Sequence, residues 1–236
     1  MNQTYAWSIP FLLAAILMIL GPALAHSGLV APIVGFMTFA IAFIPGLIAV
    51  FFGIYLLYRG DSARGWISLL VGLLPIAIIA LALVTSRDLP RINDLSTDLD
   101  SPLPLTAALT APDNAGKDLS SYPEDLKAQV RTGYPDLIAL QLSLPPPQAF
   151  ALVQKVAAAT PHWRLTRDDA QALVLEGEET AGLFQFTDDF AIRVLPMAGG
   201  SQIDMRSRSR VGKSDFGVNA KRIRAFFASL QIAAQP

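Results

Sequence analysis

The stretch "LFQFTDDFAIRVLPMAGGSQIDMRSRSRV" (183–211) predicts a β-hairpin and decides the fold. Apolar and polar residues alternate in both halves, a pattern typical of strands with one buried face. The pair Gly199-Gly200 separates the halves and is suited to a turn. This stretch therefore indicates an antiparallel sheet.

The residues around the hairpin extend this prediction. Three earlier segments, "LIALQLSL" (137–144), "HWRLTRDD" (162–169) and "QALVLEGEE" (171–179), also have strand character. Pro145–Pro147 begins a helix that continues through 148–160. A last helix is expected from near Ser214-Asp215 to about Gln231, and one of its faces would carry Phe216, Ala220, Ile223, Phe227 and Leu230. The order β-α-β-β-β-β-α predicts an α+β domain over 137–236, with an antiparallel sheet covered by two helices.

The first third of the chain has a different composition. Residues 1–86 contain only Arg59, Asp61 and Arg64 as charged side chains, whereas residues 87–236 carry 16 Lys/Arg and 18 Asp/Glu. A bilayer core of about 30 Å needs about 20 apolar residues in a helix. The sequence predicts three such transmembrane helices, at about 7–25, 29–58 and 66–84, the second tilted or kinked at Pro45-Gly46.

Two alternatives concern topology. The segment Ala23–Ala25 resembles a signal-peptidase site, but the N-terminus lacks the basic residues of a signal peptide. Loop 59–65 holds both arginines of the membrane third, so the positive-inside tendency puts it in the cytoplasm. We expect an integral protein of the inner or plasma membrane, with the C-terminal domain outside the cytoplasm. Arg87 and Arg91 argue against this orientation.

The segment 87–136 is expected to be a Pro/Asp-rich linker and docking arm. Its prolines interrupt any long helix, while recurring Leu, Ile and Tyr residues indicate packing on the domain.

Three segments resemble the domain-of-unknown-function family 1499: "INDLSTDLDSP" (92–102), "FTDDFAIRV" (186–194) and "DMRSRSRVGKSDFGVNAKRIRAF" (204–226). The likeness covers about 90–230. Members of this family often carry apolar segments before the domain, as this chain does. The resemblance implies no activity, because the family has no established one.

Positive charge gathers at 206–224, which holds seven bases and one acid. Gly212-Lys213-Ser214 imitates the end of a phosphate loop, but the first glycine of that motif would fall on Ser207 and no parallel strand-helix unit precedes it. Residues 87–236 have more acids than bases, which argues against nucleic acid. An anionic lipid or a partner protein fits a domain tethered to a bilayer better.

An internal ion-pair network is the other explanation. In a strand, Asp204, Arg206, Arg208 and Arg210 share one face, and the hairpin could set Asp189 and Arg193 against them. Carboxylates of the segment 87–136, Asp94, Asp98 and Asp100, could be further partners. The candidate anion-binding or ion-pair residues are Asp188, Asp189, Arg193, Asp204, Arg206, Arg208, Arg210, Lys213, Ser214, Asp215, Asn219 and Arg222.

Catalysis is the minority hypothesis. Cysteine is absent, which excludes thiolate chemistry, and His26 and His162 have no metal-binding spacing, so we expect neither metal nor cofactor. An Asp/Arg-dependent hydrolase of phosphate or carboxylate esters is the alternative. Adjacent Asp188 and Asp189 would point to opposite faces of a strand, which weighs against a carboxylate pair. The sequence favours a membrane-anchored binding or interaction module.

Overall fold

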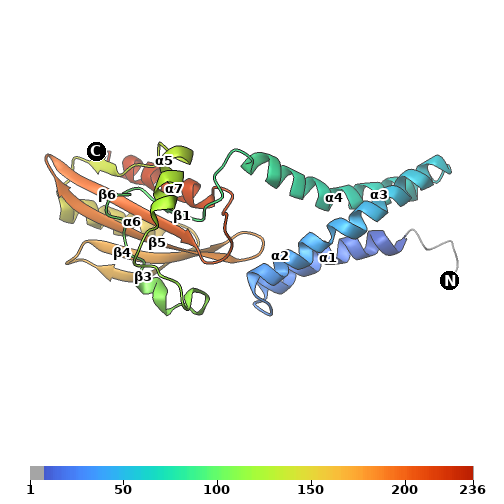
Figure 1. Ribbon diagram of the computed structural model, residues 1–236, viewed down its shortest axis with the longest axis horizontal. Coiled ribbons are helices and arrows are strands. Elements are labelled where there is room, and N and C mark those ends of the chain that lie inside the picture. Colours follow the sequence, from blue (N-terminus) through green and yellow to red (C-terminus); the bar gives the residue numbers. More distant parts are fainter. Residues whose placement is uncertain (1–7, 236) are drawn as a thin grey trace. The chain divides into compact units, whose positions relative to one another are not determined.

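The protein is described by a computed structural model, and its residues 8–235 are placed. The chain forms two compact units, a helical unit that ends at Asp88 and a sheet-containing unit that begins at Leu89 (Figure 1). The three apolar helices and the antiparallel α+β domain predicted from the sequence are both confirmed.

The helical unit contains α1 (Ser8–His26), α2 (Pro32–Ile41), α3 (Phe43–Tyr58) and α4 (Ser62–Ser86). Three segments are long and apolar enough to cross a membrane, namely α1, α2 with α3 over Pro32–Tyr58, and α4. The helix breaks at Ala42 because Pro45 has no N–H to donate to the carbonyl of Ile41, four residues earlier. A Cβ on Gly72 would lie 2.5 Å from the carbonyl oxygen of Gly46, so small residues let α3 and α4 approach closely.

The second unit contains a six-stranded antiparallel sheet. Its strands are β1 (Asp94–Ser96), β2 (Leu140–Leu142), β3 (Trp163–Asp169), β4 (Val174–Ala181), β5 (Phe186–Met197) and β6 (Gly200–Ser209). The order is β1-β6-β5-β4-β3, and β2 pairs with β6 beyond the end of β1. Gly200 is required here because a Cβ would lie 2.1 Å from the carbonyl oxygen of Leu142.

One face of the sheet packs against α6 (Pro146–Ala159) and α7 (Val218–Ala233). The apolar side chains that alternate with charged ones on β5 and β6, including Phe190, Ile192, Ile203 and Met205, are buried there. Val153 of α6 and Ile223 of α7 meet them from the helix layer. Burial of apolar side chains therefore stabilises the packing of α6 and α7 on this face of the sheet.

The other face of the sheet is covered by residues 97–122, which we call the arm. The arm contains two short 3-10 helices, Ala107–Thr110 and Pro112–Asn114, and α5 (Glu124–Gly133) follows it. A small apolar cluster joins the arm to Ala191 of β5 through Leu103, Leu105, Ala108 and Leu119. The sequence did not predict β1 or α5.

Two predicted elements have different limits in the structure. The strand predicted at 137–144 is β2, which spans only Leu140–Leu142 because the residues on either side do not pair with β6. The last helix begins at Val218 and ends at Ala233, so Phe216 precedes it and is exposed. Phe226 is buried on the helix face instead, and Asp215 lies outside the helix.

Candidate functional site

The charged row of β6 lies under the arm. The hairpin register sets Arg208 opposite Asp189 and Asp204 opposite Arg193, so these side chains of β5 and β6 share the arm face of the sheet. The β5–β6 hairpin thus brings together residues that were predicted to form one ion-pair network.

Arg206 is at the centre of this row and is only 1% exposed. Its Nε and Nη2 donate to the two carboxylate oxygens of Asp94 at 2.9 and 2.8 Å. Its Nη1 donates to the carbonyl oxygens of Leu103 and Leu119 at 2.7 and 3.2 Å. Its guanidinium also lies 5.0 Å from the ring centroid of Tyr122, a cation–π distance. Arg206 therefore joins β1, β6 and both ends of the arm.

Arg210 binds two carboxylates of neighbouring strands. Its Nη2 lies 2.6 Å from Asp189 and 2.5 Å from Glu178. Burial by itself would lower the pKa of Arg210. The hydrogen bond to Asp189 and the negative charge of Asp189 outweigh burial and raise the pKa of Arg210 above its ordinary value. Asn114 of the arm donates to the same Asp189 carboxylate at 2.7 Å.

Arg193 forms the third group of the row. Its Nη2 lies 2.9 Å from Asp204 on β6 and 3.0 Å from Asp98 of the arm. Gln202 donates to the other oxygen of Asp204 at 2.9 Å. Asp100, the third acidic residue expected to reach the row, instead pairs with Arg131 of α5 at 3.1 Å on the surface.

Arg208 is less well paired than its neighbours. Its Nε lies 3.4 Å from Asp94, and its buried Nη1 has no hydrogen-bond partner among the described residues. Lys117 of the arm donates to the carbonyl oxygen of Arg210. Burial, and then the charge of Arg208, lower the pKa of Lys117.

A second polar cluster lies on the helix face. Arg222 of α7 donates to Asp188 and to Glu179, each at 2.6 Å. It also donates to the side-chain oxygens of Ser207 and Asn219 at 2.8 and 2.6 Å. Asp188 and Asp189 therefore belong to separate clusters on opposite faces of the sheet.

The turn before α7 contains Lys213, Ser214 and Asp215. The carboxylate of Asp215 accepts the backbone N–H groups of Gly217 at 2.9 Å and of Asn219 at 2.7 Å. These are the amides that an anion at the start of α7 would use. Lys213 is exposed and Ser214 is half-buried.

Sequence reasoning missed Glu176, Glu178 and Glu179 of β4. Glu176 is buried and accepts the backbone N–H of Ala107 at 2.8 Å, which fixes a 3-10 helix of the arm. Glu176 and Glu178 are two residues apart in a predicted strand, so the sequence could have predicted that they lie on the same face of the sheet.

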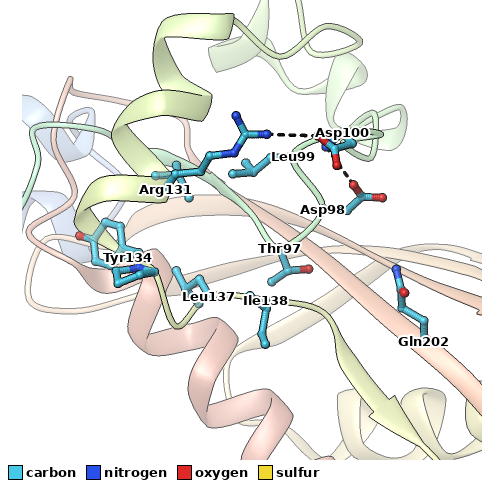
Figure 2. A pocket seen from close by; sticks show the side chains of 11 residues that line it. Thr97, Asp98, Leu99, Asp100, Arg131, Tyr134, Leu137, Ile138 and Gln202 are labelled. Carbon is cyan, nitrogen blue, oxygen red and sulfur yellow. Dashed lines mark hydrogen bonds and ion pairs between the residues drawn. The ribbon is translucent and has the colours of Figure 1, made fainter.

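A cleft of about 370 Å³ opens at the edge of the sheet, where the pairing of β1 with β6 ends and that of β2 begins (Figure 2). Its residues come from the arm, from α5 and the segment after it, and from β6. They are Thr97, Asp98, Leu99, Asp100, Val130, Arg131, Tyr134, Pro135, Leu137, Ile138 and Gln202. No pattern in the sequence predicted that these segments meet.

The cleft combines apolar and polar groups. In Figure 2, Leu137 and Ile138 lie near Thr97, while Arg131 and Asp100 meet across one side. Ile138 is 69% exposed at this cleft. Asp98 and Asp100, which the sequence suggested as partners of the arginine row, line the cleft, whereas the candidate residues of β5, β6 and α7 are not among its described lining residues. No group of three or more metal-ligating side chains occurs within residues 8–235.

An antiparallel α+β domain that follows apolar helices long enough to cross a bilayer defines a membrane-anchored α+β protein. Residues 94–230 match the family described as "Protein of unknown function (DUF1499)", and this match spans more than half of the chain. The chain therefore belongs to that family, as its resemblance predicted. No curated protein matches the chain.

Proposed function

We propose that this protein is a membrane-anchored binding module that takes an amphiphilic ligand or peptide segment in the cleft at the edge of its sheet. One observation carries the proposal: Arg206 and Arg210 bind carboxylates and carbonyl groups under the arm, whereas the cleft is open. Pockets of about 300–1,000 Å³ that combine an apolar lining with a few polar groups are typical of ligand sites.

The chemistry of the lining defines the ligand class. Leu99, Leu137 and Ile138 offer apolar contact, while Gln202 and the Arg131–Asp100 pair offer hydrogen bonds and charge. A ligand with an apolar part and a polar end would use both kinds of group.

The hydrolase alternative would need a carboxylate and an arginine that face a common opening. Asp188 binds Arg222 on the helix face, and Asp204 binds Arg193 on the arm face. Both carboxylates are buried, and neither lines the cleft. This arrangement supports binding rather than hydrolysis.

The proposed orientation places this domain outside the cytoplasm, at the inner or plasma membrane. It rests on Arg59 and Arg64, the two bases of the loop before α4. Reporter fusions after residue 236 test it. A reporter that works only in the cytoplasm should be inactive there, and an active one would overturn the orientation.

Photo-crosslinking of the full chain in cells tests the cleft. A benzoylphenylalanine at Ile138 should give a discrete adduct whose mass identifies the ligand. The matched control carries the same group at Leu109, which is 53% exposed on the arm and does not line the cleft. Equal labelling at both positions, or no adduct at Ile138, would contradict the proposal.

A further inference from the structure

The connection between β6 and α7, residues 210–217, carries an exposed apolar side chain, and the first residue of α7 carries another. Phe216 is 54% exposed, and Val218, the first residue of α7, is 48% exposed. These two residues are separated only by Gly217, and we call them the apolar tip. Burying them would be favourable, yet no described part of the domain does so.

The backbone of Phe216 is unusual for its position. Its φ of 53° lies in the left-handed region, which is a rare conformation for a bulky residue. Gly217 follows with φ 80°. A Cβ there would lie 2.9 Å from the side chain of Leu89, so the turn packs closely against the segment that follows α4. Such conformations persist where the surroundings fix them, and they gather at functional sites.

Several hydrogen bonds fix the turn to the linker after α4. The backbone N–H of Asp215 donates to the carbonyl oxygen of Ile92 at 3.3 Å. The side-chain amide of Asn93 donates to the carbonyl oxygen of Gly212 at 2.6 Å. Asn219 returns a hydrogen bond to the carbonyl oxygen of Asn93 at 3.2 Å. The turn therefore moves together with residues 89–93.

The length of the chain limits the distance of the turn from the bilayer. The apolar helix α4 ends at Ser86, and Leu89 already contacts the turn. Three residues span at most about 11 Å when fully extended. The tip is thus held within reach of the headgroup region in which α4 ends.

The charges nearby suit an anionic surface. Residues 87–91 and 211–221 carry four bases, Arg87, Arg91, Lys213 and Lys221, against two acids. One of the acids, Asp215, is buried and binds the start of α7. An exposed aromatic side chain flanked by lysines is a combination that favours the membrane interface.

We propose that Phe216 and Val218 insert into the headgroup region of the bilayer that α4 crosses, and that Lys213 and Lys221 contact anionic lipids there. This docking fixes the orientation of the domain relative to the membrane surface. It does not depend on the ligand of the cleft or on which side of the membrane the domain lies.

The chain has no cysteine, so single labelled cysteines can test the insertion in the full protein. Phe216→Cys carries an environment-sensitive fluorophore in nanodiscs of phosphatidylcholine with phosphatidylglycerol. The matched control is Ile232→Cys, 70% exposed near the other end of α7 and about 20 Å further along the helix. We expect headgroup-quencher lipids to quench the label at Phe216 several-fold more than the control, and iodide in water to quench it several-fold less.

Three further variants separate lipid docking from a structural role. Phe216→Gly relieves the left-handed backbone, so the melting temperature of the domain should stay the same or rise. Replacing Lys213 or Lys221 with Gln should lower the docked-to-undocked ratio roughly fivefold on anionic nanodiscs and leave it unchanged on pure phosphatidylcholine.

Three results would overturn the proposal. They are equal iodide quenching at Phe216 and Ile232, protection from iodide without quenching by lipids, which indicates a protein partner, and a lower melting temperature for Phe216→Gly.

Discussion

The two faces of the sheet are covered by different kinds of interaction. On one face, α6 and α7 bury apolar side chains such as Phe190 and Ile223. On the other face, the arm lies on a row of guanidinium and carboxylate groups, of which Arg206 and Asp94 are almost fully buried. Apolar contacts tolerate small shifts, whereas a two-pronged Arg–Asp pair fixes geometry. The arm is therefore held in one register by charges that cannot be removed singly without a large penalty.

The largest effect is expected from Arg206→Met. Among the described residues it leaves Asp94 buried with the 3.4 Å contact to Arg208 alone, and breaking a buried pair costs about 3–5 kcal/mol. The arm should open first, so hydrogen exchange of residues 97–122 should accelerate more than that of α6 and α7. Temperature-dependent proteolysis of the full chain in detergent measures the total loss.

The matched control for this prediction is Arg131→Met, because its pair with Asp100 is exposed, at 59% and 94% of the two side chains. Such a pair contributes about 0–1 kcal/mol. The double variant Asp94→Leu/Arg206→Met should recover part of the loss, since it removes both charges. Equal effects of Arg206→Met and Arg131→Met would refute the view that buried charges hold the arm.

The apolar face should respond differently. Ile223→Ala leaves a cavity between α7 and the sheet and should cost about 2–5 kcal/mol. Hydrogen exchange should then accelerate in α6 and α7 before it does so in the arm, the reverse of the order in Arg206→Met. Ile232→Ala, an exposed control on the same helix, should stay within about 0.5 kcal/mol of the parent. Identical exchange patterns in the two core variants would show that the faces unfold as one unit.

The smallest effect is expected in the loss of folding stability at acidic pH. Burial favours a higher pKa for Glu178, but its hydrogen bonds with Arg164 and Arg210 outweigh burial and lower the pKa below its ordinary 4.5. The charged form therefore adds stability that is present above pH 4.5 and is lost as pH falls through the lowered value. Glu178→Gln should show a shallower loss of stability in this range, whereas Ile223→Ala should keep the slope of the parent. A parental slope in Glu178→Gln would exclude a contribution from this pair.

Much of the architecture could be predicted from local patterns. Alternation on both sides of Gly199-Gly200 predicted the hairpin, and its register sets Asp189 and Arg193 against the charged row. Long apolar runs predicted the membrane helices. These features depend on residues close together in sequence, where period and turn chemistry suffice.

The remaining features depend on contacts without a side-chain pattern. Arg206 binds the carbonyl oxygens of Leu103 and Leu119, and every residue carries such a group. Phe216 fitted the helical period of α7 but precedes the helix because Gly217 turns the chain. The cleft joins distant segments such as those of Thr97 and Ile138, so its existence follows from tertiary packing alone.

The pairing of β1 with β6 has a consequence during synthesis. Asp94 and Arg206 are 112 residues apart, and β6 is the last strand to leave the ribosome. At roughly 5–20 residues per second, Asp94 waits about 6–22 s for its partner. During that time the arm lacks its contacts with Arg206, and β1 and β2 lack β6, the strand with which they pair. A nascent chain halted before residue 200 should therefore expose the arm to proteases, and completion and release of the chain should protect it.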